Sequence, residues 1–95
     1  MRTIELSNAF KRDYKRTKAN PCHAQDVRAL YETTVLLLAK DEPLSENYRD
    51  HALVGEWKGY RECHLKPDLL LIYRTAEPAI LRIARLGSHA EIFRK

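Results

Sequence analysis

The spacing of the apolar residues differs between the two halves of the chain. In the first half they recur every three to four residues, which is the period of a helix. The longest such stripe consists of Val27, Leu30, Tyr31, Thr34, Val35, Leu37 and Leu38. We predict that this stripe belongs to the main core helix, which Asn20 caps, with Pro21 in its first turn, and which ends near Lys40.

A strand and a shorter helix are predicted before the main core helix. Thr3 to Leu6 can form a first strand, and Ser7 or Asn8 can cap a helix that runs to about Ala19. The members of its apolar face are Leu6, Phe10, Tyr14 and Thr17.

The second half contains short apolar runs separated by turn residues, after a polar loop from Asp41 to Asp50. The predicted strands are Tyr60 to Leu65, Leu69 to Thr75 and Ala79 to Leu86, and the predicted turns are 66–68 and 76–78. Such spacing favours antiparallel hairpins, with the continuously apolar second strand at the centre of the sheet. We therefore expect an α+β fold with the order β-α-α-β-β-β, two helices on one face of a small sheet, and an open second face. His89 to Arg94 is too short for an independent helix, so we expect a turn or a docked tail.

Composition limits the classes of protein to consider. A chain of 95 residues with 44% hydrophobic residues is the size of one domain, which we expect to span residues 1–95. No apolar run approaches the roughly 18 residues that cross a bilayer, so we expect a cytoplasmic protein without membrane contact. Cys22 and Cys63 lack disulfide or zinc spacing and are predicted to be free thiols.

Positive charge is concentrated in the first helix. The chain carries a formal charge of +4, and five basic residues fall within one short segment: Lys11, Arg12, Lys15, Arg16 and Lys18, interrupted only by Asp13. This cluster is typical of a helix that faces phosphates, although a solvated helix surface explains it equally well. Lys11, Lys15 and Arg16 are the predicted contacts to the phosphates of a polyanion.

The candidate chemistry comes from histidines and carboxylates, because the chain has no glycine-rich phosphate loop, no GxSxG and no metal-binding motif. We expect neither a cofactor nor a metal. Strand alternation places Glu62 and His64 on one face, and Asp68 lies at the tip of the same predicted hairpin. His51 precedes the sheet and His89 follows it. Such a set can cleave RNA without metal, since one group removes the 2′-hydroxyl proton and another protonates the leaving oxygen.

Each of these residues also has a structural interpretation. A single histidine is more often a surface or hydrogen-bonded imidazole than a catalytic one. Trp57 could stack on a base or belong to the core, and Phe93 could hold a base or fix the tail. Arg85 could neutralise a phosphate or simply end the strand in water, and alternation places it on the face of Leu81 and Ile83.

Several segments resemble one toxin family in order and spacing. They are Asp50 to Leu53 (DHAL), Gly55 to Tyr60 (GEWKGY), Arg61 to Asp68 (RECHLKPD), Leu70 to Tyr73 (LLIY) and Arg85 to Phe93 (RLGSHAEIF). Together they make the chain similar to the YafQ branch of the RelE superfamily of bacterial toxins. The resemblance implies a RelE-like fold and metal-independent cleavage of messenger RNA, on the ribosome, through attack by the 2′-hydroxyl.

The resemblance also implies a set of site residues. The predicted catalytic residues are His51, Glu62, His64, Asp68 and His89. Arg85 would neutralise the scissile phosphate, and Phe93 would hold a base.

The resemblance further implies a cognate antitoxin as partner, besides mRNA and the ribosome, and contact with operator DNA only through the antitoxin complex. The alternative is a non-catalytic module of the RelE or ParE fold. Such a module would act through antitoxin binding and transcriptional autoregulation, or by inhibiting a protein target.

Overall fold

The computed structural model of the chain describes residues 1–76 and 79–93. Its helices and strands follow one another as β1 (Thr3–Leu6), α1 (Asn8–Ala19), α2 (Val27–Ala39), β2 (His51–Ala52), β3 (Arg61–Lys66), β4 (Leu69–Ala76), β5 (Ile80–Gly87) and α3 (His89–Ile92). Two single 3-10 turns flank β2, namely η1 (Glu46–Tyr48) and η2 (Gly55–Trp57). None of the helices in the described residues has the length and apolar content needed to cross a membrane.

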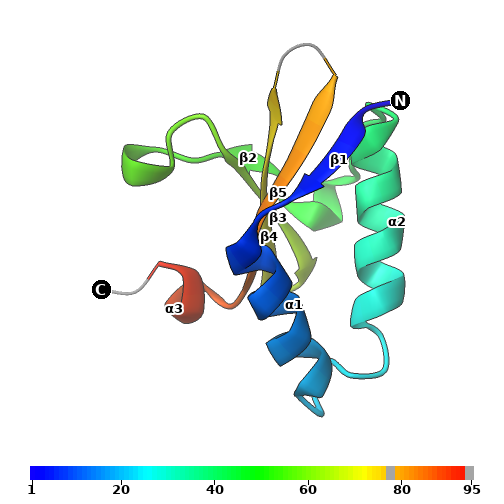
Figure 1. The fold of residues 1–95 in the computed structure, drawn as a ribbon, viewed down its shortest axis with the longest axis vertical. Coiled ribbons are helices and arrows are strands. Elements are labelled where there is room, and N and C mark those ends of the chain that lie inside the picture. The colour runs from blue at the N-terminus through cyan, green and yellow to red at the C-terminus, as the bar shows by residue number, and fades with distance from the viewer. Residues whose placement is uncertain (77–78, 94–95) are drawn as a thin grey trace.

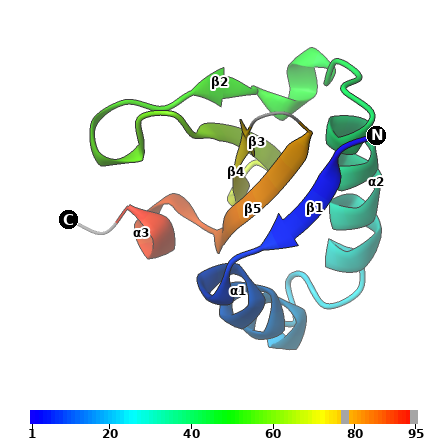
Figure 2. The same ribbon diagram turned by 45° about the horizontal axis from the view of Figure 1, so that its top comes forward.

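The strands form one sheet in the order β1-β5-β4-β3-β2 (Figure 1). β1 runs parallel to β5, as Figure 2 shows, and every other pair is antiparallel. β4 occupies the central position that its continuous apolar sequence predicted. The α+β class and the order of the main elements are confirmed, and the short strand β2 is an addition that the sequence did not indicate.

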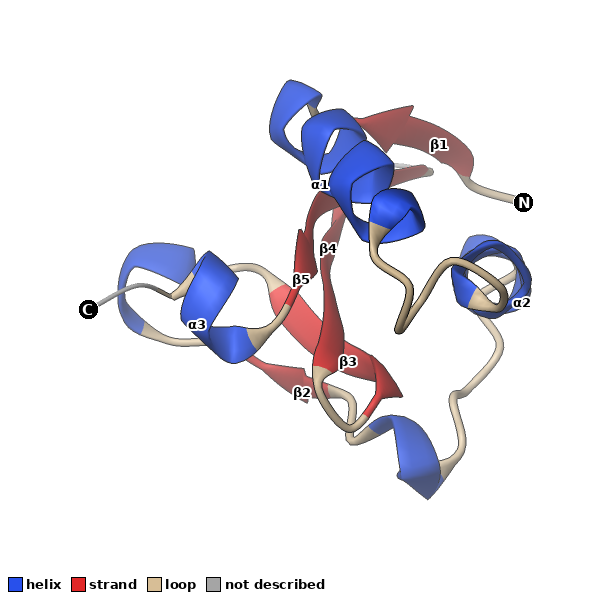
Figure 3. Cartoon of the chain, turned by 90° about the horizontal axis from the view of Figure 1, so that it is seen from below, coloured by secondary structure: helices blue, strands red, loops and turns tan. Residues whose placement is uncertain are grey.

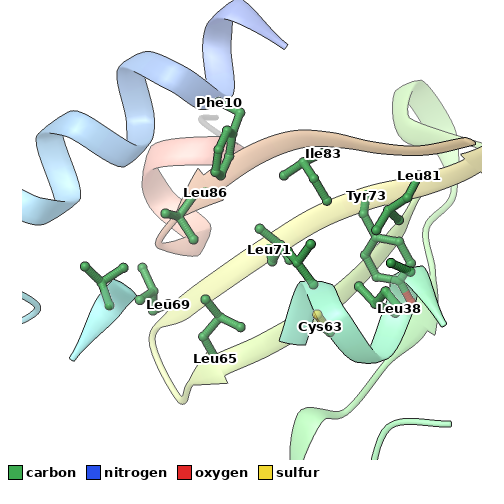
Figure 4. Close-up of a cluster of buried hydrophobic side chains, with 13 residues drawn as sticks. Phe10, Leu38, Cys63, Leu65, Leu69, Leu71, Tyr73, Leu81, Ile83 and Leu86 are labelled. Atoms are coloured by element: carbon green, nitrogen blue, oxygen red, sulfur yellow. The ribbon is translucent and has the colours of Figure 1, made fainter. Parts of the chain in front are cut away.

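The apolar core lies between one face of the sheet and the first two helices. Phe10 of α1 and Leu38 of α2 pack with Cys63, Leu71 and Ile83 of the sheet (Figure 4). Burial of each such side chain stabilises the fold by about 1.5–3 kcal/mol. Figure 3 shows α3 on the opposite side of the sheet from α2. Two helices therefore cover one face, as predicted, and of the described segments the short α3 and the region around η2 lie on the second face.

The predicted start of the core helix is wrong. Asn20 is the C-cap of α1, and its side-chain oxygen accepts a hydrogen bond from the Cys22 N–H at 2.9 Å. Asparagine can close a turn on its own backbone as readily as it caps a helix, and here the turn prevails. Residues 21–26 consequently form turns, and α2 begins only at Val27.

The tail forms one helical turn fixed by a capping box. The Ser88 side chain accepts from the Glu91 N–H at 3.2 Å, and the Ser88 N–H donates to Glu91 Oε1 at 2.9 Å. These two hydrogen bonds satisfy backbone N–H groups at the start of α3 that would have no partner within the helix. Arg94 and the predicted turn residues 77–78 lie outside the described residues.

A bulge in β5 changes the face on which Arg85 lies. Tyr73 pairs with Ile83, but the preceding residue of β4, Ile72, pairs with Arg85, so Ala84 is an extra residue in β5. An extra residue reverses the alternation beyond it. The expectation that Arg85 shares a face with Leu81 and Ile83 is therefore wrong.

Asp13 joins α1 to β5 from a buried position. Its carboxylate accepts from Arg85 Nε at 2.6 Å and Nη2 at 3.2 Å, and from the Leu86 N–H at 3.0 Å. Arg16 Nη1 lies 3.1 Å from the same carboxylate. Burial by itself raises the pKa of Asp13, but the hydrogen bonds and charges of these partners outweigh it and leave the pKa below its usual value.

We predict that Asp13→Ala lowers the free energy of unfolding by about 2–3 kcal/mol, because it leaves Arg85 and the Leu86 N–H without their acceptor. The control is Asp41→Ala, whose exposed ion pair with Arg2 should contribute less than about 1 kcal/mol. Denaturant unfolding measures both.

The same pair of proteins tests the pH dependence. Because folding lowers the pKa of Asp13, its stabilising contribution is complete above the unfolded value of about 3.9 and is lost as pH falls through the folded value. The difference between the parent and Asp13→Ala should therefore narrow below about pH 4. A difference that stays constant down to pH 2 would contradict this assignment.

Candidate active site

Glu62 lies on the open face of the sheet with 2% of its side chain exposed. Its neighbours in β3, Cys63 and Leu65, face the helices and join the apolar core, as the predicted alternation requires. Burial raises the pKa of the Cys63 thiol and keeps it inert. A carboxylate buried to this extent needs polar partners, because an unpaired charge in such a place costs several kcal/mol.

Three histidines supply those partners. His64 Nε2 lies 3.2 Å from Glu62 Oε2, and His51 Nε2 lies 3.6 Å from the same oxygen. His89 Nε2 lies 3.7 Å from the other oxygen, Oε1. The three imidazoles come from β2, β3 and α3, and their meeting at one carboxylate is the convergence that sequence spacing could not establish. We call these four residues the Glu62 cluster.

Separate features of the backbone bring each histidine to Glu62. His51 and Glu62 are direct partners in the β2–β3 ladder. The capping box around Ser88 starts α3 at His89. His64 is two residues beyond Glu62 on the same strand and therefore shares its face.

The residue before His51 anchors the loop that carries it. Asp50 accepts hydrogen bonds from the Tyr73 hydroxyl at 2.5 Å and from Arg61 Nε at 3.3 Å. Burial and the bond to Asp50 raise the pKa of Tyr73, so the phenol keeps its proton and remains a donor. The same contact gives the Arg61 guanidinium, which strand alternation directs toward the side of Cys63 and Leu65, a partner for its charge.

The exposure of the cluster separates its members by what they can touch. His51 and His89 keep 54% and 64% of their side chains exposed, so each can reach a bound molecule while facing Glu62. His64 keeps only 13% and Glu62 almost none. Glu62 is therefore placed to orient imidazoles, and His51 and His89 are placed to exchange protons with a ligand.

A hollow of about 640 Å³ opens directly over this cluster. His51, Glu62 and His89 line it together with Trp57 and Phe93. The Trp57 and Phe93 rings stand edge to face with centroids 6.2 Å apart. The hollow thus combines proton-transfer groups with aromatic surfaces, which is what a nucleotide needs for chemistry and for base stacking. We call it the aromatic hollow.

The remaining predicted residues lie at other positions. Asp68 is exposed beyond β3 and borders a smaller hollow of about 300 Å³ with Arg16 and Ser88. Arg85 is bonded to Asp13 through two of its nitrogens. The roles predicted for Asp68 in proton transfer and for Arg85 on the phosphate stay predictions.

The basic face of α1 is only partly available. Lys11 and Lys15 are exposed, and within residues 1–76 and 79–93 neither takes part in an ion pair. Arg16 instead bridges Asp13 and Glu91, at 3.1 Å and 3.5 Å.

Sequence reasoning left two features unassigned. The sequence allowed Trp57 either a core position or a base-stacking position. The tertiary structure places it in the aromatic hollow. Asp13 appeared only as an interruption of the basic cluster, although a lone acid among basic residues could have suggested an internal pair. Among the described residues, no three His, Cys, Asp or Glu side chains are arranged to hold a metal ion.

The fold and the Glu62 cluster together define a class of small α+β protein with a cluster of histidines around a buried carboxylate on the open face of its sheet. Residues 2–94 match the family described as the bacterial toxin of type II toxin-antitoxin systems, YafQ. The mRNA interferase toxin YafQ of Escherichia coli strain K12 is 40% identical over 92 residues, which cover 97% of this chain and 96% of the relative. The chain therefore belongs to the YafQ family of type II toxins.

Solved structures agree with this assignment. A metal-bound toxin from Helicobacter pylori is 45% identical to this chain, with a TM-score of 0.87. The alignment covers 98% of this chain and 100% of the toxin. YafQ in the DinJ–YafQ complex of Escherichia coli is 38% identical with a TM-score of 0.81, over 98% and 99% of the two chains. The fold is thus the RelE-like fold that the sequence resemblance implied.

We predict that Glu62→Gln perturbs all three imidazoles of the cluster at once, because one carboxylate is their common partner. Correlation spectra of the histidine ring nitrogens should show shifted Nε2 signals for His51, His64 and His89 in the variant. His23, which contacts Lys66 instead, should keep its signals and serves as the internal control. A response confined to one ring would contradict the shared arrangement.

Proposed function

We propose that the protein is an endoribonuclease that cleaves messenger RNA without a metal ion, using the Glu62 cluster for proton transfer. The observation that carries the proposal is the set of three imidazole nitrogens within 3.2–3.7 Å of one buried carboxylate. Relatives that bear the name mRNA interferase support it, since they match nearly the whole chain.

The reaction follows from the properties of imidazole. A neutral histidine removes the proton from a ribose 2′-hydroxyl, and the 2′-oxygen attacks the neighbouring phosphorus. A protonated histidine gives its proton to the 5′-oxygen as the bond from phosphorus to that oxygen breaks. The products are a 2′,3′-cyclic phosphate and a free 5′-hydroxyl. His51 and His89 are the proposed proton carriers because of their exposure, and His64 and Glu62 hold the array in place.

Substrate binding divides between the aromatic hollow and the surrounding charge. Phe93 is the proposed platform for one base, beside Trp57, since stacking on an aromatic ring contributes about 1–3 kcal/mol per base. Lys11 and Lys15 on α1 would hold phosphates of mRNA or of the ribosome without regard to sequence.

The proposed setting follows from family membership. A type II toxin has a cognate antitoxin, and the DinJ–YafQ complex is such a pair in a relative. We propose that this chain acts as a single domain in the cytoplasm on ribosome-associated mRNA, and that it meets operator DNA only through its antitoxin complex.

Purified protein should cut RNA in the presence of EDTA and leave a 2′,3′-cyclic or 3′-phosphate. We predict that His89→Ala lowers the cleavage rate by about 10²–10⁴-fold, because it removes a proposed proton carrier. His64→Ala should also lower the rate, because His64 holds the array in place. His23→Ala lies outside the Glu62 cluster and should cut at the parental rate.

The outcome also decides between the two functions. If the parent leaves RNA whole while still binding antitoxin, the non-catalytic module is the correct interpretation. If the histidine variants cut as fast as the parent, the cluster is not the site.

The α1 surface yields a separate prediction. Replacing Lys11 and Lys15 by Gln should weaken association with RNA or ribosomes and lower the slope of log K against log salt by about 0.7 for each lost phosphate contact on a single strand. The free energy of unfolding should change by less than about 0.5 kcal/mol, because both side chains are exposed. Association that is unchanged across a salt series would remove α1 from the binding surface.

A further inference from the structure

The Glu62 cluster lies beside a second, larger hollow that the proposed mechanism does not use. This hollow has a volume of about 880 Å³ and lies between η1 and the end of β3. His64 lines it, whereas His51, Glu62 and His89 line the aromatic hollow. The proton-transfer array therefore separates two cavities, each large enough for a nucleotide.

Arg49 is the cation that borders this second hollow with its charge available. Its side chain is exposed, and among the described residues it forms no ion pair and no hydrogen bond. Its backbone is left-handed, with φ of 49°, and its carbonyl accepts a hydrogen bond from His51 Nδ1 at 2.8 Å. The Arg49 guanidinium thus belongs to a residue whose backbone directly contacts His51 of the Glu62 cluster.

Several other basic residues near the cluster already have internal partners. Arg85 is bonded to Asp13, and Arg61 to Asp50. Lys66, which also lines the second hollow, lies 2.9 Å from Asp26 and donates to the Cys22 carbonyl at 2.9 Å. Glu46 contributes one carboxylate to the same wall. Of the described basic residues that line this hollow, Arg49 is therefore the one whose charge has no internal partner.

A phosphodiester under attack joins two nucleotides that extend in opposite directions from the phosphorus. With one base held in the aromatic hollow, the neighbouring nucleotide continues past His64. We propose that the hollow lined by Arg49 and His64 binds this neighbouring nucleotide, and that Arg49 holds its phosphate. This inference rests on the proposed nuclease function and adds a second subsite to it.

Arginine suits this task because its planar guanidinium binds phosphate oxygens in pairs. An exposed arginine that meets a phosphate only when substrate is present acts mainly on substrate affinity. Loss of such a contact should therefore change KM more than kcat.

The test uses a short RNA that the parent cuts at one bond. Arg49→Gln should raise KM about tenfold, equivalent to one charge-assisted hydrogen bond, and should change kcat by less than about threefold. Arg49→Lys keeps the charge and should stay within about threefold of the parental KM. Arg28→Gln is the control, because it removes the same charge from the exposed surface of α2.

Two trimmed substrates locate the contact. One lacks the phosphates beyond the nucleotide on the 5′ side of the cut bond, and the other lacks those on the 3′ side. The rise in KM caused by Arg49→Gln should disappear with one trimmed RNA and persist with the other, as in a double-mutant cycle. Arg49→Gly removes the charge in a residue that tolerates the left-handed backbone, so it replaces the Gln variant if that protein does not fold.

The results separate this inference from the function on which it rests. A parent that does not cut RNA refutes the nuclease proposal itself. A parent that cuts, with Arg49→Gln and Arg28→Gln giving the same KM on every substrate, refutes the second subsite alone. A fall in kcat with unchanged KM also refutes it, because Arg49 would then act only through its hold on His51.

Discussion

The arrangement of the open face depends on one buried carboxylate. Glu62 is 2% exposed, and an isolated charge in such a place would be too costly to keep. Three imidazoles from different parts of the chain lie within 3.2–3.7 Å of it. The contacts that place polar groups beside the buried carboxylate also hold the imidazoles in one array, so the surroundings of Glu62 and the alignment of the three rings depend on the same atoms.

Further ion pairs fix the segments that deliver those imidazoles. The Asp50–Arg61–Tyr73 set anchors the loop before His51. On the opposite side, Arg16 bridges buried Asp13 and Glu91 of α3. Gly87 permits this second arrangement, because a Cβ there would lie 2.8 Å from Glu91 Oε1. Polar contacts outside the site therefore determine the geometry within it.

Much of the fold could be predicted because its signals are local. Apolar periodicity predicted α1, the body of α2 and the central position of β4, and alternation predicted that Glu62 and His64 share a face. The start of α2 and the face of Arg85 were missed, since Asn20 satisfies two local structures and the bulge at Ala84 leaves no mark in the sequence pattern. Tertiary pairing decided both.

The site itself could be predicted in membership but not in arrangement. Family resemblance supplied His51, His64 and His89, yet no spacing along the chain indicates that all three would meet at Glu62. Resemblance also gave Arg85 a role on the phosphate without indicating that Asp13 already pairs with it. Partners that lie more than 70 residues away cannot be read from a local pattern.

The formal charge of the chain consequently overestimates the positive charge that is available to bind a polyanion. Of the 17 lysines and arginines, several near the open face are paired internally, including Arg16, Arg61, Lys66 and Arg85. A cation that is already paired within the protein binds an incoming phosphate weakly, because its existing ion pair must first be broken. Among the described residues, the cations without an ion pair include Lys11, Arg12 and Lys15 on α1, Lys58 after η2 and Arg49 beside His51. Affinity for RNA should therefore depend on the position of these few side chains more than on the net charge of +4.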